Sequence, residues 1–208
     1  HYSGTPRPRS SRWGTVGWEE LTDGVVVAAQ PTGAPSWFPC NDLPRYKSTY
    51  EISLTTESSY TVTATGELQS KSDKSGFTTW NFQQEIPTPT YLASIQIGRY
   101  RHRENELSGV PVHIFAPPAN EPKVNADLDK LEAMMSFFSE TFGPYPFESY
   151  TVVVTADELE IPLEAQGMAI FGANHLDGSN PEERLVAHEL AHQWFGNSVG
   201  IAQWSDIW

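Results

Sequence analysis

The hydrophobic pattern changes its period at a proline-rich break, and this change constrains the fold more than any other feature of the chain. The break covers residues 116–122 and reads APPANEP. Before it, apolar and polar residues alternate, as Tyr50, Ile52 and Leu54 do with their neighbours, which is the period of half-buried strands. After it, apolar residues recur every three or four positions over 128–142, which is the period of an amphipathic helix. The sequence therefore predicts an α+β chain.

Two domains are expected on either side of this break. Residues 1–117 are predicted to form an antiparallel β-sandwich or saddle-shaped sheet, because short strand patterns recur between turn-forming stretches. Residues 118–208 are predicted to form a second domain that contains helices. The strand patterns lie at 25–29, 50–55, 60–65, 78–82, 91–97, 110–115 and 151–154, and the predicted helices at 128–142 and from Asn180-Pro181 to about Phe195.

Charge and composition exclude several classes of partner. The 208 residues include 26 acidic and 13 basic side chains, so we expect neither nucleic acid nor an anionic membrane surface as a partner. No apolar run approaches the ~18 residues of a membrane span. A cytoplasmic location is expected, although the single cysteine, Cys40, is compatible with export as well. Because the chain stops within an aromatic-rich run, WSDIW at 204–208, we expect it to be a fragment.

The last predicted helix contains the sequence His188-Glu189-Leu190-Ala191-His192, an H-E-x-x-H motif. Side chains four residues apart lie on the same side of a helix, so both imidazoles can reach one zinc ion. Glu189 lies about 100° further around the helix and can take a proton from a water on the metal. A chance occurrence in a chain of this length has a probability on the order of 1%. The motif therefore predicts a zinc site with Glu189 as its general base.

A third zinc ligand is not evident in the residues that follow. The metzincin pattern would place a glycine and a histidine at positions occupied by Phe195 and Ser198. Asp206 is the only later acid, and its spacing fits a surface or capping residue better than a ligand. Two other histidines are interpreted without a metal: His102 as a solvated strand end and His175 as a loop residue.

The stretch HELAHQWFGN at 188–197, followed by WSDIW at 204–208, resembles the signature of the zinc aminopeptidases of the aminopeptidase N type, which include the leukotriene hydrolase aminopeptidases. The resemblance implies a zinc cofactor and peptide substrates with a free N-terminus. It implies that the second domain is the first part of a thermolysin-like catalytic domain whose remainder is its partner. It also implies that the third ligand, a glutamate, lies three residues beyond Trp208, with the catalytic tyrosine further on.

The same resemblance implies two contacts to the substrate amine. The family's Gly-Ala-Met-Glu-Asn motif corresponds to a stretch here that keeps only its acid, Glu164, with Glu158 and Glu160 as competitors if the register is shifted. A loop that reads QPTGAPSWFPCND at 30–42 resembles the family's Phe-Pro-Cys-x-Asp loop, in which Gln30 would contact the same amine. The alternative interpretation of Gln30 is that its side-chain amide only forms hydrogen bonds within its own turn.

Three functions are compatible with these residues. The first is removal of N-terminal amino acids from peptides, with this fragment itself inactive or nearly so because the third ligand and the tyrosine are outside it. The second is a hydrolase of the same fold that opens epoxides. The third is a non-catalytic β-sandwich interaction module, against which the intact H-E-x-x-H motif speaks.

Overall fold

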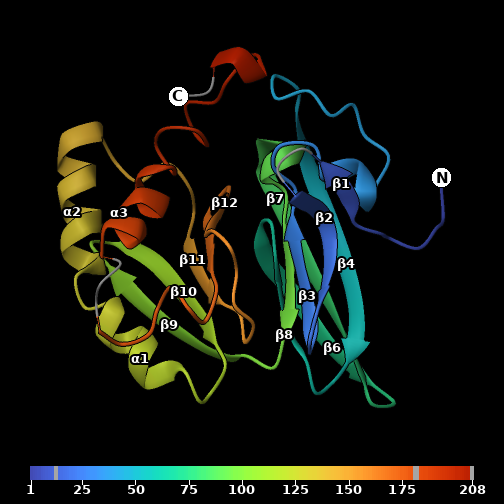
Figure 1. Ribbon diagram of the computed structural model, residues 1–208, viewed down its shortest axis with the longest axis horizontal. Helices are drawn as coiled ribbons and strands as arrows, with labels where there is room; N and C mark the ends of the chain where they lie inside the picture. The colour runs from blue at the N-terminus through green and yellow to red at the C-terminus, as the bar shows by residue number, and fades with distance from the viewer. Residues whose placement is uncertain (12–13, 180–182, 207–208) are drawn as a thin grey trace. The chain divides into compact units, whose positions relative to one another are not determined.

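The structure, a computed structural model, describes residues 1–11, 14–179 and 183–206 (Figure 1). The chain divides into two compact units. The first, which we call the two-sheet unit, comprises the described residues of 1–58, 62–97 and 200–208, and the second, the mixed-sheet unit, comprises those of 59–61 and 98–199. Sheets predominate and a few helices accompany them, so the predicted α+β class is confirmed.

The two-sheet unit contains a five-stranded and a three-stranded sheet. The five-stranded sheet has the order β1 (Arg9–Ser11), β2 (Gly14–Leu21), β3 (Gly24–Ala28), β8 (Ile95–Gly98) and β5 (Thr61–Ala64). The three-stranded sheet has the order β4 (Lys47–Glu57), β7 (Phe77–Pro89) and β6 (Glu67–Lys74), with antiparallel neighbours. Along β4 exposed residues alternate with half-buried ones, as the two-residue period predicts. Three short 3₁₀ helices also belong to the unit: Ala34–Ser36, Thr90–Leu92 and Trp204–Asp206.

The mixed-sheet unit contains one five-stranded sheet with three helices. Its strand order is β12 (Leu163–Ala165), β13 (Met168–Phe171), β11 (Tyr150–Val154), β10 (Val110–Ala116) and β9 (Arg101–Leu107). The pairs β10/β11 and β11/β13 are parallel, whereas β9/β10 and β12/β13 are antiparallel. Helices α1 (Glu121–Asp127), α2 (Leu131–Phe142) and α3 (Glu183–Ala191) share a core with one face of this sheet (Figure 1). That core includes Val112 and Val152 from strands and Met135 and Leu190 from helices.

The limit between the two compact units at residues 97 and 98 lies about twenty residues before the boundary that the change in hydrophobic period predicts. Strands β9 and β10 precede the proline-rich break, yet they pair with β11 across it and belong to the mixed-sheet unit. A two-residue period shows that a segment is a strand but does not identify the sheet that it joins. The boundary predicted at residue 117 therefore marks the end of the last strand before the helices, not the limit of a compact unit.

Two predicted helices differ from those observed. The pattern at 128–142 predicts one helix, and α2 confirms it but begins three residues later, at Leu131, after a turn at 128–130. Helix α1 precedes that turn, in a stretch for which the sequence predicts no helix. The last helix ends at Ala191 rather than near Phe195, because the backbone tightens there: the N–H of Gln193 bonds to the carbonyl of Leu190 at 3.1 Å. The predicted helix start at 180–182 lies outside the described residues.

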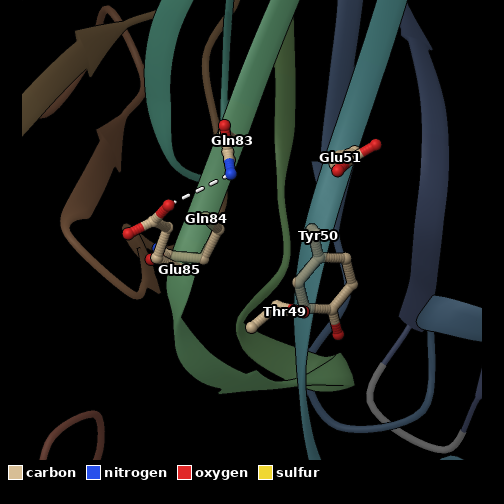
Figure 2. A pocket seen from close by; sticks show the side chains of 6 residues that line it. All are labelled: Thr49, Tyr50, Glu51, Gln83, Gln84 and Glu85. Carbon is tan, nitrogen blue, oxygen red and sulfur yellow. Dashed lines mark hydrogen bonds between the residues drawn. The ribbon is translucent and has the colours of Figure 1, made fainter.

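A polar hollow of about 520 Å³ lies on the two-sheet unit where β4 and β7 lose register between Ser48 and Tyr50 (Figure 2). Gln83 donates a hydrogen bond to Glu85 at 3.1 Å along its wall. The lining combines Thr49, Tyr50, Glu51, Gln83, Gln84 and Glu85.

None of the helices in the described part of the chain is long and apolar enough to cross a membrane.

Candidate metal centre

Helix α3 presents the H-E-x-x-H motif with one side against the core and one side toward solvent. Val186 and Leu190 are buried, and Trp194, just beyond the helix, donates its indole N–H to the carbonyl of Gly143 at 2.9 Å. His188 is exposed on the other side. His192 follows the last helical residue, yet its N–H still bonds to the carbonyl of His188 at 3.1 Å. The two histidines therefore still lie on the same side of the chain, as the sequence predicts, although His192 is beyond the end of the helix.

The two imidazoles converge at the spacing that a metal ion requires. The Nε2 atoms of His188 and His192 lie 3.0 Å apart. Nδ1 of His192 lies 3.1 Å from the carbonyl oxygen of Phe195, and a carbonyl only accepts, so this nitrogen carries the proton and Nε2 keeps its lone pair. Two nitrogens bound to one tetrahedral zinc at ~2.0–2.1 Å are about 3.3 Å apart. The observed pair fits zinc with little movement.

Glu189 is buried beside these histidines. Its side chain is 4% exposed, and Oε2 has no hydrogen-bond partner among the described residues. Burial, and secondly the nearby charge of Glu164, raise the pKa of Glu189 to about 8. An unpartnered carboxylate in such a place is costly unless a cation or a proton accompanies it. The orphaned oxygen therefore fits a site built around a positive charge.

Glu164 belongs to the same cluster. Ligand atoms of Glu164, Glu189 and His192 all lie within 4.8 Å of one another. Glu164 lies in β12, which forms a hairpin with β13 through a two-residue turn at 166–167, where Gly167 has a φ of +75°. The competing acids, Glu158 and Glu160, are exposed on the preceding loop. The register that selects Glu164 thus brings this acid to the histidines.

Two amides of the same stretch were not assigned a role from the sequence. Gln193 is fully buried, accepts a 2.8 Å bond from the N–H of Gly167 and lies 3.4 Å from the carbonyl of Ala165. Asn197 donates to that carbonyl at 3.0 Å. Both therefore tie the β12/β13 hairpin, and with it Glu164, to the segment that carries His192. In the sequence, the signal for these two amides is their position directly after the apolar stripe of the last helix.

The remaining residues singled out in the sequence lie elsewhere or have structural roles. Nδ1 of His175 accepts the N–H of Gly172 at 3.0 Å, and Asp206 accepts the N–H of Gln203 at 2.9 Å as a cap. Gln30 lies in the turn after β3, in the two-sheet unit, and its contact with a substrate amine stays a prediction. Tyr150, to which the sequence assigns no role, is fully buried, and burial, and secondly the charge of Glu189, raise the pKa of its hydroxyl.

Two family profiles match this chain, one in its N-terminal half and one in its C-terminal half. The profile of the peptidase M1 N-terminal domain matches residues 22–92, and that of the peptidase family M1 domain matches residues 126–208. The second match contains the histidines, Glu189 and Glu164.

Individual relatives agree with these profiles. Aminopeptidase Ey of Gallus gallus is 32% identical over 91% of this chain and 22% of its own length, and the mitochondrial aminopeptidase 2 of Saccharomyces cerevisiae is 28% identical over 88% and 20%. The crystal structure of an M1 zinc metallopeptidase from Deinococcus radiodurans superposes with a TM-score of 0.84 at 29% identity, over 98% of this chain and 47% of that one. The chain thus spans about a fifth of the first two relatives and about half of the third.

Proposed function

Because this chain belongs to the peptidase M1 family, we propose that it supplies two zinc ligands, the general base and an amine anchor to a zinc aminopeptidase. The observation that carries the proposal is the convergence of His188, Glu189 and His192 with Glu164 in one cluster. Nε2 atoms of His188 and His192 would hold the zinc. When bound, zinc supplies a Lewis acid that polarises the scissile carbonyl and makes a water acidic.

Glu189 acts as the general base in this proposal. A cation nearby favours the charged carboxylate, the form that can accept a proton from the attacking water. The same group then hands that proton to the departing amine of the cleaved peptide. Its burial supports this role, because a carboxylate shielded from bulk water transfers protons only to groups admitted to the site.

Glu164 anchors the free α-amino group of the substrate, and Gln30 assists it. A partly buried carboxylate forms a charge-assisted hydrogen bond with an ammonium, which a peptide offers only at its N-terminus. This contact restricts cleavage to the first residue. Support for a peptide substrate comes from a related M1 zinc metallopeptidase, from Deinococcus radiodurans, whose E323A mutant was solved bound to a Tyr-Ser-Ala substrate; it is 28% identical with a TM-score of 0.82.

The 208 residues alone are proposed to be inactive or nearly so. Two imidazoles hold zinc weakly, and by the family resemblance the third ligand and the oxyanion-stabilising tyrosine would lie beyond Trp208. Kinetic tests therefore use a protein that contains this chain together with those residues. Full activity with one tightly bound zinc in the 208-residue chain would contradict this part of the proposal.

The decisive experiment compares Glu189→Gln with the parent enzyme on an aminoacyl-anilide. We expect kcat to fall by about 10²–10⁴-fold, since a general base contributes on that scale, with zinc content unchanged. Glu164→Gln should raise KM and reduce the preference for a free over an N-acetylated amine. Glu158→Gln, an exposed acid on the neighbouring loop, is the matched control and should leave both constants unchanged. Unaltered turnover of Glu189→Gln would refute the proposed function, and turnover of an epoxide alone would identify the other hydrolase.

A further inference from the structure

A second pair of histidines converges on the β9/β10 ladder. Nε2 of His102 lies 3.1 Å from Nδ1 of His113. In the antiparallel register His113 is opposite Glu104 and Phe115 is opposite His102, so all four side chains lie on one face of adjacent strand pairs. Their spacing is that of diagonal neighbours held by a regular ladder, which is a rigid support for a site.

The geometry of this pair matches that of the signature histidines. The nitrogen separation of 3.1 Å compares with 3.0 Å between His188 and His192, and both are close to the ~3.3 Å expected for two ligands of one tetrahedral ion. Without an ion, one ring nitrogen donates to the other. Replacing that proton with a metal needs only a small opening of the pair.

The orientation of the His102 ring is fixed by stacking. Its ring lies 4.3 Å from that of Phe115 with an interplanar angle of 7°, and Phe115 is 7% exposed. Partial desolvation, and secondly His113, lower the pKa of His102, while Glu104 opposes them. The neutral imidazole, which is the form that binds a metal, is therefore favoured.

The surrounding charges also suit a cation. Glu104 is close enough to act electrostatically on His102 and faces His113 across the ladder. Both basic neighbours along the strand, Arg101 and Arg103, lie on the opposite face of the ladder from His102, and Arg101 is paired with Glu121 at 2.7 Å. Among the described residues, the group with three possible metal ligands is that of Glu164, Glu189 and His192. The β9/β10 ladder therefore offers two imidazoles, and water or a reoriented Glu104 would complete the coordination of an ion.

We propose that His102 and His113 form a second, solvent-open metal site for a divalent transition ion of the class that imidazole prefers, with Zn²⁺ as the representative. His102 would bind through Nε2 and His113 through Nδ1. The site has fewer protein ligands than a structural zinc site, so its affinity is weaker. It is independent of the H-E-x-x-H cluster and of the proposed peptidase function.

The test isolates this pair in the 208-residue chain. The chain has six histidines, and a background variant with His1→Ala, His188→Ala and His192→Ala keeps only His102, His113 and His175. Titration with Zn²⁺ in a calorimeter should show about one ion bound per chain. His102→Gln or His113→Gln in this background should weaken binding at least about tenfold, the scale on which even outer partners of metal ligands act. Glu106→Gln, on the same face of the ladder, is the matched control.

Long-range ¹H–¹⁵N spectra of the background variant identify the ligand atoms directly and do not depend on how the further variants fold. On adding Zn²⁺ we expect the resonances of His102 Nε2 and His113 Nδ1 to shift, with those of His175 unchanged. Circular dichroism verifies that each variant retains its fold. Absence of Zn²⁺ binding by the folded background variant, or shifts confined to other nitrogens, would overturn the proposal.

Discussion

The two-sheet unit and the mixed-sheet unit both bury polar side chains, but of different kinds. The two-sheet unit buries neutral groups: Ser94 donates to the carbonyl of Val27 at 2.9 Å, and Gln96 donates to Ser94 at 2.8 Å, while Oε1 of Gln96 has no hydrogen-bond partner among the described residues. The mixed-sheet unit buries Glu189, a carboxylate with an oxygen that no described residue satisfies.

This difference distinguishes neutral polar groups, which stabilise a fold through hydrogen bonds, from an ionisable group that is buried at a functional site. A hydrogen-bonded hydroxyl or amide contributes a modest stabilisation and costs little to bury. An unpartnered ionisable group is costly, and such groups cluster at functional sites. The free energy of unfolding of the mixed-sheet unit should therefore rise when a cation binds near Glu189. That of the two-sheet unit should not change when metal is added.

The largest expected effect is the dependence of stability on pH. The pKa of Glu189 is 4.5 in an unperturbed chain and about 8 in the fold. Between these values the unfolded chain has lost its proton and the folded chain keeps it, so the free energy of unfolding falls as pH rises. The full change is on the order of 5 kcal/mol. Urea unfolding of the metal-free chain between pH 5 and 8 measures this slope.

Two variants test whether Glu189 causes this change of the free energy of unfolding with pH. Glu189→Gln should flatten it and make the chain more stable than the parent at pH 8. Glu51→Gln, an exposed acid of the two-sheet unit, should leave it unchanged. An identical slope in the Glu189→Gln chain would mean that the buried carboxylate is not the cause and would remove the contrast between the units.

The next effect concerns the amide that ties the hairpin to the helix. Gln193→Ala leaves the N–H of Gly167 without an acceptor and opens space in a fully buried place, so we expect a loss of about 3 kcal/mol. In the two-sheet unit, Thr65→Val removes the acceptor of the Ser94 N–H, bonded at 2.7 Å, and should cost about 1–2 kcal/mol. Chemical denaturation measures both losses.

These two variants also differ in what they do to metal binding. Gln193→Ala should weaken Zn²⁺ binding, because the segment that carries the proposed ligand His192 is no longer tied to the β12/β13 hairpin, whereas Thr65→Val should not. Equal Zn²⁺ affinities for the two variants would show that Gln193 serves stability alone.

The smallest effect compares two glycines with positive φ. Gly196 has a φ of 114°, and a Cβ there would lie 3.1 Å from Nδ1 of His192, so Gly196→Ala should cost about 2 kcal/mol and disturb the imidazole. Gly76, in the β6/β7 turn, has a φ of 83° and open space around it, so Gly76→Ala should cost about 1 kcal/mol. Thermal unfolding with and without Zn²⁺ measures both. A Zn²⁺-induced stabilisation that Gly196→Ala leaves intact would contradict the link to His192.

The sequence predicts those parts of the molecule that depend on local periodicity. The alternation at Tyr50, Ile52 and Leu54 identifies β4, and the four-residue spacing of His188 and His192 identifies the converging imidazoles. Both follow from the geometry of one element and require no knowledge of its neighbours.

The rest depends on pairings between distant segments. The parallel pairing of β10 with β11 assigns residues before the proline-rich break to the mixed-sheet unit, and no local pattern encodes it. The role of Gln193 depends on a hairpin 26 residues earlier, and the approach of His102 to His113 depends on the β9/β10 register. The sequence alone indicates a solvated strand end at His102, and this residue is indeed exposed and second in β9, but its partner is visible only in the fold.

Anomalous diffraction at the zinc edge, from zinc-loaded crystals of the protein, is the most direct test of the proposed metal centre. We expect a peak at ~2.0–2.1 Å from the Nε2 atoms of both His188 and His192, with the carboxylate of Glu189 facing it but not bound. A peak that neither nitrogen ligates, or Glu189 turned away from it, would show that this metal centre is wrong.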